Sequence, residues 1–132
     1  MTSRNRWDTV TFIAAAAFNL SAAALLLWRP ELTLARLGIA DLSAKLLARS
    51  LASSAAAWGI GYALLALNPK RFREFAWLGA LSKTFFALIY AVAYLSGQIH
   101  FSAFAPALVE ILFAWLFIRY LRRTPDKPVE PQ

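Results

Sequence analysis

The chain has 132 residues, of which 60% are hydrophobic and 16% are charged, and its mean hydropathy is +0.53. Average soluble domains are about half apolar and about a quarter charged, so this composition argues against a soluble domain. The absence of cysteine excludes disulfides, thiolate metal sites and a cysteine nucleophile, and the single histidine excludes sites that need several histidines. We therefore expect no metal and no cofactor.

Four long apolar segments predict four transmembrane helices. Each segment approaches the roughly 20 residues that a helix needs to cross the hydrocarbon core. None of them alternates in polarity, as the strands of a membrane β-barrel do. The expected fold is all-α, a transmembrane four-helix bundle that forms a single domain over residues 1–123. Its spans cover about residues 12–28, 46–67, 75–95 and 105–120.

The connections between the spans carry residues that stop and start helices. Because proline and glycine terminate helices, three dipeptides mark the ends of the first three spans. Asp41 is a suitable N-cap for the second span. The segment 30–41 is expected to lie in the membrane interface as a short amphipathic or re-entrant piece. The three stops are Arg29-Pro30, Asn68-Pro69 and Ser96-Gly97.

The two ends of the chain need separate interpretation. Arg4 and Arg6 before an apolar stretch resemble the start of a signal peptide. The apolar run, however, extends to Leu27 and ends at Trp28 without a small-residue cleavage site, which favours a retained span. Residues 124–132 contain three prolines and charges of both signs, so they are expected to form a disordered cytoplasmic tail.

The distribution of basic residues predicts the orientation. Nine of the fourteen Lys and Arg residues flank one side of the spans, and three flank the other. The positive-inside rule therefore places both termini in the cytoplasm of a bacterial inner membrane. Because the charges flank spans, the net charge of +7 does not indicate nucleic-acid binding. The nine are Arg4, Arg6, Lys70, Arg71, Arg73, Arg119, Arg122, Arg123 and Lys127, and the three are Arg29, Arg36 and Lys45.

Three ionisable residues fall inside the predicted spans, where a charge is costly and is a functional candidate by default. They are Arg49, Lys83 and Glu110. Small residues follow Arg49 at helical spacing, which suggests that it faces another helix. Asn19 and Tyr90 occupy faces suited to the same interior. The candidate site is therefore an inward polar cluster of Asn19, Arg49, Lys83, Tyr90 and Glu110.

Two interpretations of this cluster remain open. In the first, Arg49 and Glu110 form a buried ion pair that only locks two helices together. In the second, two cations and one carboxylate leave an excess positive charge in a low dielectric. Either Lys83 is then neutral, or an anion completes the site, held by the Arg49 guanidinium and by tyrosine hydroxyls.

Several short motifs resemble a group of small bacterial four-helix membrane proteins that are loosely similar to the DoxX-like superfamily. They are Asn19 in the first span, Arg49 followed by A-W-G-I-G-Y (57–62) and N-P-K-R (68–71), then W-L-G-A-L-S-K (77–83), and Glu110 before L-F-A-W-L-F (112–117). The resemblance implies an integral inner-membrane four-helix bundle. Members of the wider superfamily are linked to quinone-linked oxidoreductase subunits and to maturation factors. Because this chain has no cysteine, no thiol-redox role follows, and only the fold is carried over.

Two functions are compatible with these features. The first is a small membrane protein that binds or moves a small anionic or lipid-like ligand through the polar cluster. The alternative is a non-catalytic membrane subunit or assembly factor whose buried charges are a structural lock, and which associates with a partner membrane protein or with itself. No catalytic residue is predicted, because the only histidine lies in a loop and the serines are scattered.

Overall fold

The computed structural model describes residues 3–41 and 43–124, and these residues form five α-helices and no strand. Each of the four long helices has the length and hydropathy of a membrane span. The prediction of an all-α fold with four long apolar helices is confirmed. Most of the predicted tail, residues 125–132, lies outside the described residues. The helices are α1 (Ser3–Trp28), α2 (Pro30–Arg36), α3 (Ser43–Leu67), α4 (Arg73–Leu95) and α5 (Phe101–Arg123).

The ends of the long helices agree with the sequence better than their beginnings do. The first three long helices end at Trp28, Leu67 and Leu95, directly before the predicted stops. Helix α1 begins nine residues earlier than predicted, because polar residues can continue a helix beyond its apolar stretch. Helix α5 begins at Phe101 although Pro106, in its second turn, has no N–H to donate to the carbonyl one turn earlier.

The predicted interfacial segment contains the short helix α2. Pro30 is its first residue, where the missing N–H costs nothing. Asp41 caps the start of α3 as predicted, because its carboxylate accepts bonds from the backbone N–H (2.9 Å) and the hydroxyl (2.7 Å) of Ser43. These two bonds hold the pKa of Asp41 below its ordinary value. The Nε of Arg29 donates to Glu31 at 2.5 Å and lowers the pKa of that exposed carboxyl in the same way.

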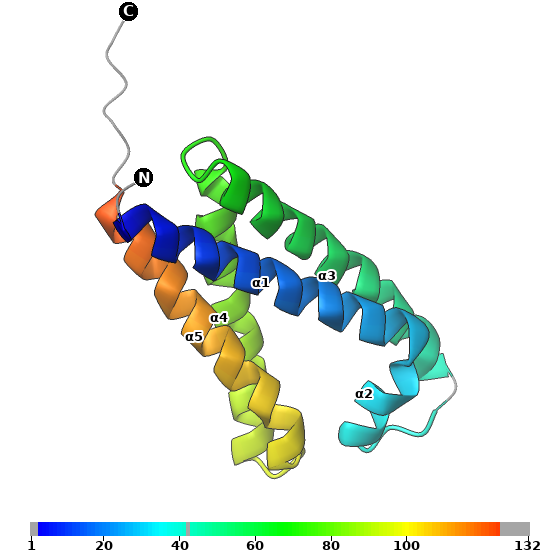
Figure 1. The fold of residues 1–132 in the computed structure, drawn as a ribbon. Helices are drawn as coiled ribbons and strands as arrows, with labels where there is room; N and C mark the ends of the chain where they lie inside the picture. The colour runs from blue at the N-terminus through cyan, green and yellow to red at the C-terminus, as the bar shows by residue number, and fades with distance from the viewer. Residues whose placement is uncertain (1–2, 42, 125–132) are drawn as a thin grey trace, which may run out of the picture.

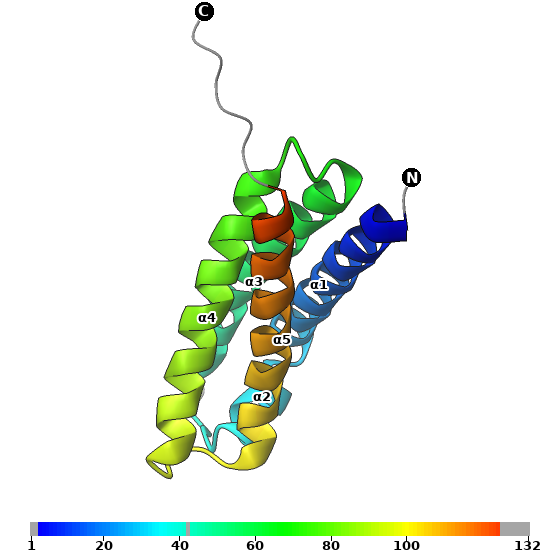
Figure 2. The ribbon, with the colours of Figure 1, turned by 90° about the vertical axis from the view of Figure 1, so that its left-hand side faces the viewer.

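The long helices form two antiparallel hairpins, α1 with α3 and α4 with α5, and each helix packs mainly along its hairpin partner (Figure 1). We call one end of the molecule the closed end. It holds the start of α1, the α3–α4 connection and the end of α5. The opposite, open end holds α2 and the α4–α5 connection. In Figure 1 the hairpins separate toward the open end, and Figure 2 shows the same molecule turned by 90°.

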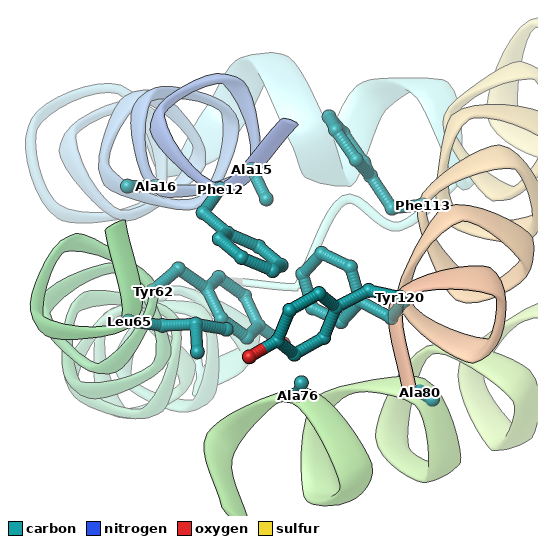
Figure 3. Close-up of a cluster of buried hydrophobic side chains, with 10 residues drawn as sticks. Phe12, Ala15, Ala16, Tyr62, Leu65, Ala76, Ala80, Phe113 and Tyr120 are labelled. Atoms are coloured by element: carbon teal, nitrogen blue, oxygen red, sulfur yellow. The ribbon is translucent and has the colours of Figure 1, made fainter. Parts of the chain in front are cut away.

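The aromatic core lies in the half of the bundle nearer the closed end. Figure 3 shows rings from α1, α3 and α5 that converge on one another. The Phe12 ring contacts the rings of Tyr120 and Phe117 with centroids 5.0 and 5.5 Å apart, and Tyr62 contacts Phe117 at 5.1 Å. Because lipid is as apolar as these side chains, such close ring packing rather than the hydrophobic effect holds helices together in a bilayer. The rings therefore join the two hairpins.

Gly79 allows this core to close. It is buried in α4, where a Cβ would lie 2.7 Å from the Tyr62 ring and 2.9 Å from the Phe117 ring. Atoms cannot approach so closely, so any side chain at this position would displace both rings. The close approach of Tyr62 matters for the site, because Gly79 lies one turn before Lys83 on the same face of α4.

Candidate functional site

An ion pair between Lys83 of α4 and Glu110 of α5 lies inside the second hairpin. The Nζ of Lys83 donates a hydrogen bond to Oε2 of Glu110. The side chain of Lys83 is 3% exposed and that of Glu110 is 12% exposed. The intramembrane charges at positions 83 and 110 therefore neutralise each other.

The local sequence explains why these two side chains meet. On α4, Lys83 shares its buried face with small residues one and two turns away. On α5, Ala107 and Ala114 flank Glu110 at one-turn spacing, and both are buried. Small residues let two helix backbones approach closely, so the long lysine side chain reaches the carboxylate across the interface. The small buried residues of α4 are Ala76, Gly79, Ala80 and Ala87.

Two aromatic rings complete the surroundings of the ammonium group. The Lys83 Nζ lies 5.0 Å from the centroid of the Tyr62 ring and 5.3 Å from that of Phe113. An ammonium has three N–H donors, and ring faces attract a cation within about 6 Å. The carboxylate and the two rings thus solvate Lys83 from different sides. Sequence reasoning missed both rings, although Tyr62 lies one turn from Gly59, a residue that permits close packing, and Phe113 lies one turn from Glu110 on the same helix.

Arg49 does not belong to this group, and the interpretation in which Arg49 and Glu110 form a buried pair is wrong. Its side chain is exposed, and its Nε lies 3.4 Å from the backbone oxygen of Leu27 in α1. The packed face of α3 includes Ala48 and Ala52, so Arg49 is turned by about 100° from it. With Arg49 turned away, Lys83 and Glu110 form a charge-balanced pair without an excess positive charge.

The other two predicted residues lie apart from the ion pair. Tyr90 is half-buried, and its ring stacks on Phe86 with centroids 4.4 Å apart. Asn19 is 8% exposed, on the face of α1 that also buries Ala15 and Ala23. Within residues 3–41 and 43–124, neither side chain is hydrogen-bonded to Lys83 or Glu110. Of the five candidates, the structure brings two together.

A surface hollow between the hairpins, which we call the groove, lies toward the open end. It has a volume of about 470 Å³. Apolar side chains line most of it, and Arg36 and Ser102 add polar groups. The sequence did not predict the groove. Its lining residues are Phe18, Arg36, Ser102, Ala105, Pro106 and Val109.

One aromatic contact connects the groove with the ion pair. Phe18, which lines the groove, packs against Phe113 with ring centroids 5.9 Å apart. The Phe113 ring in turn faces the ammonium of Lys83 at 5.3 Å. Phe113 thus contacts both the wall of the groove and the buried charges.

The groove also has hydrogen-bonding capacity on α5. Pro106 cannot donate to the backbone carbonyl of Ser102, so that carbonyl lacks its usual intrahelical donor. The Ser102 hydroxyl lies on the same wall, while Arg36, across the groove on α2, forms no ion pair within the described part of the chain. The described residues contain no group of three side chains that could hold a metal ion.

Comparisons of this chain with protein-family models, with curated proteins and with solved structures gave no match.

Proposed function

We propose that the protein is a small multi-pass protein of the bacterial inner membrane, DoxX-like in fold, with both termini in the cytoplasm, that binds a lipid-like molecule with an anionic head group. In this proposal the ligand occupies the groove, and the cluster predicted from the sequence is replaced by the groove and the ion pair behind it. The observation that carries the proposal is the composition of the groove, which is apolar along most of its lining and includes the guanidinium of Arg36, which forms no ion pair with another described residue.

The chemistry of the groove supports this class of ligand. The groove is an open hollow, so it suits a ligand that stays partly in contact with the surrounding lipid. A guanidinium binds carboxylates and phosphates with two parallel hydrogen bonds, so Arg36 suits an anionic head group. Phe18 and Val109 suit an alkyl chain, and Ser102 offers a hydroxyl and a carbonyl to a polar linker.

Native mass spectrometry of the detergent-extracted protein tests this function, with oleate as the anionic probe and oleyl alcohol as its neutral counterpart. We expect the wild type to retain oleate in preference to the alcohol. Ala105→Trp fills the groove and should abolish retention, whereas Arg36→Gln should remove the preference for the charged head. Ile111→Trp is the matched control, because Ile111 is exposed on the same helix and does not line the groove. Equal retention by the two tryptophan variants would exclude the groove as the site.

The second candidate is a non-catalytic subunit or assembly factor, and the closed ion pair favours it. Lys83 and Glu110 are charge-balanced and covered by rings, and neither lines the groove. Such a pair needs no ligand to be stable. This candidate predicts that the extracted protein carries no oleate in any variant and instead retains a second membrane protein or a second copy of itself.

A further inference from the structure

The closed end of the molecule is strongly basic, and the proposed groove ligand does not account for this. Seven of the described basic side chains belong to this end, against two acidic ones, Asp8 and Glu74. Five of the basic side chains are exposed on the α3–α4 connection and the last turns of α5, and we call these five the basic patch. They are Lys70, Arg71, Arg119, Arg122 and Arg123.

Specific hydrogen bonds bring the two halves of the patch together. The hydroxyl of Tyr120 in α5 donates to the backbone oxygen of Pro69 at 2.7 Å. Arg73, at the start of α4, donates through Nε to the oxygen of Thr124 at 3.0 Å. The connection is also folded on itself, because the side-chain oxygen of Asn68 accepts from the N–H of Arg71 at 3.1 Å. Residues some 50 positions apart in sequence are thereby fixed side by side.

The patch continues directly into an apolar surface. The Arg119 guanidinium lies 5.5 Å from the ring of Trp115, one turn deeper on α5, and that tryptophan is 56% exposed. Exposed tryptophans and snorkelling arginines are typical of the level of lipid head groups. The anion that meets this patch therefore belongs to a molecule whose remainder is apolar, which distinguishes it from a nucleic acid.

We propose that the basic patch is a binding site for the phosphodiester head groups of anionic phospholipids. Fixed cations at the membrane surface attract anionic lipids, and the effect falls off within a Debye length. The site is independent of the membrane orientation, because it faces the head groups of whichever leaflet borders the closed end. It is also independent of the groove, which lies toward the open end.

Competition between lipids tests the site. The delipidated wild-type protein is mixed with equal amounts of phosphatidylglycerol and phosphatidylcholine, and the bound lipids are counted by native mass spectrometry. We expect a several-fold preference for phosphatidylglycerol. In a parallel experiment, the thermal stabilisation of the protein by each lipid is measured with and without about 1 M NaCl. Because the Debye length is roughly 3 Å at this salt concentration, the salt should remove the preference for phosphatidylglycerol.

Paired charge removals locate the site. Arg122→Gln/Arg123→Gln should lose about half of the preference, because it removes two of the five cations. Arg29→Gln/Lys45→Gln removes the same charge near the open end and should keep the wild-type preference. Ala105→Trp should also keep it, so a failure of the groove proposal would not affect this one. The melting-temperature shift caused by each lipid is compared within each variant, so a change in basal stability does not obscure the result.

Three outcomes would overturn the proposal. They are a wild type without preference for phosphatidylglycerol, an equal loss in both double variants, and displacement of the lipid by the same concentration of glycerol phosphate. The last outcome would mean that the patch binds the phosphate group alone.

Discussion

Lys83 is a cation in a span that is otherwise apolar, and its neighbours determine what that charge costs. An isolated ammonium in a membrane interior is destabilising by several kcal/mol. Here the Glu110 carboxylate and two ring faces replace the water that the ammonium would have outside the membrane. The pair contributes little more to the free energy of unfolding than two apolar residues of similar volume would. Removing either partner, however, leaves a buried charge without a partner, which is strongly destabilising.

A double-mutant cycle tests this account. We expect Lys83→Met and Glu110→Gln each to lower the free energy of unfolding by about 3–5 kcal/mol. The double variant should recover much of that loss, because it leaves no buried charge. Reversible unfolding in mixed detergent micelles measures all four proteins of the cycle.

Arg49 supplies the control for this cycle. Because its Nε lies near the Leu27 oxygen and not near Glu110, Arg49→Met should be additive with Glu110→Gln. Near-zero effects of both Lys83→Met and Glu110→Gln would contradict a buried pair, since the charges would then reach water.

The sequence identified both members of this pair, but the ion pair considered in one of its two interpretations placed Arg49 rather than Lys83 beside Glu110. Lys83 and Glu110 are recognisable because a charged residue in an apolar span rarely faces lipid. The choice of partner depended on which face of α3 packs inward. Arg49 and Ala48 are adjacent in sequence and both precede small residues at helical spacing, so the pattern fits either face. Only the packing of α3 against α1 decides between them.

At the scale of elements, the sequence predicts the connections between helices better than it predicts which face of each helix packs inward. Proline, glycine and aspartate act locally, so the stops after α1, α3 and α4 and the cap of α3 followed from the sequence. The groove did not follow from it. Its lining comes from α1, α2 and α5, and so depends on how far the hairpins diverge, which no local pattern encodes.

The cap at Asp41 makes the start of α3 sensitive to acid. Bonds from Ser43 hold the pKa of Asp41 below its ordinary value of 3.8. The cap therefore stabilises α3 fully at pH above that value, and the stabilisation is lost as the pH falls through the lower folded pKa. We expect the amide chemical shift and the hydrogen-exchange protection of Ser43 to change in that acidic range, as measured by NMR in micelles.

Asp41→Asn separates titration from capping. Asparagine keeps an acceptor oxygen for the Ser43 amide but has no carboxyl to titrate. The Ser43 amide of this variant should show no such acid transition. An identical transition in the two proteins would mean that another group causes the change.

At the scale of the whole molecule, the two ends differ in both packing and charge. The rings that join the hairpins and the basic patch both lie toward the closed end, while the groove lies toward the open end. Tyr120 links the first two features, because its ring packs on Phe12 and its hydroxyl holds the connection that carries Lys70 and Arg71. A molecule fixed at one end and divergent at the other can admit a ligand without opening its core.

The same arrangement makes the membrane orientation testable. The start of α1, the α3–α4 connection and the end of α5 share the closed end (Figure 1), and they carry most of the basic residues. The positive-inside rule predicts that this end faces the cytoplasm, which is the orientation given in the proposed function. Reporter fusions after Gln132 and within 70–73 should therefore report the cytoplasm, and a fusion within 98–101 should report the opposite side. A variant with Lys70, Arg71 and Arg73 changed to Gln serves as the charge control. It should reduce the fraction of molecules in which the closed end lies in the cytoplasm, while the helices keep their boundaries. A periplasmic reporter after Gln132 in the wild type would reverse the orientation and place the groove on the cytoplasmic side.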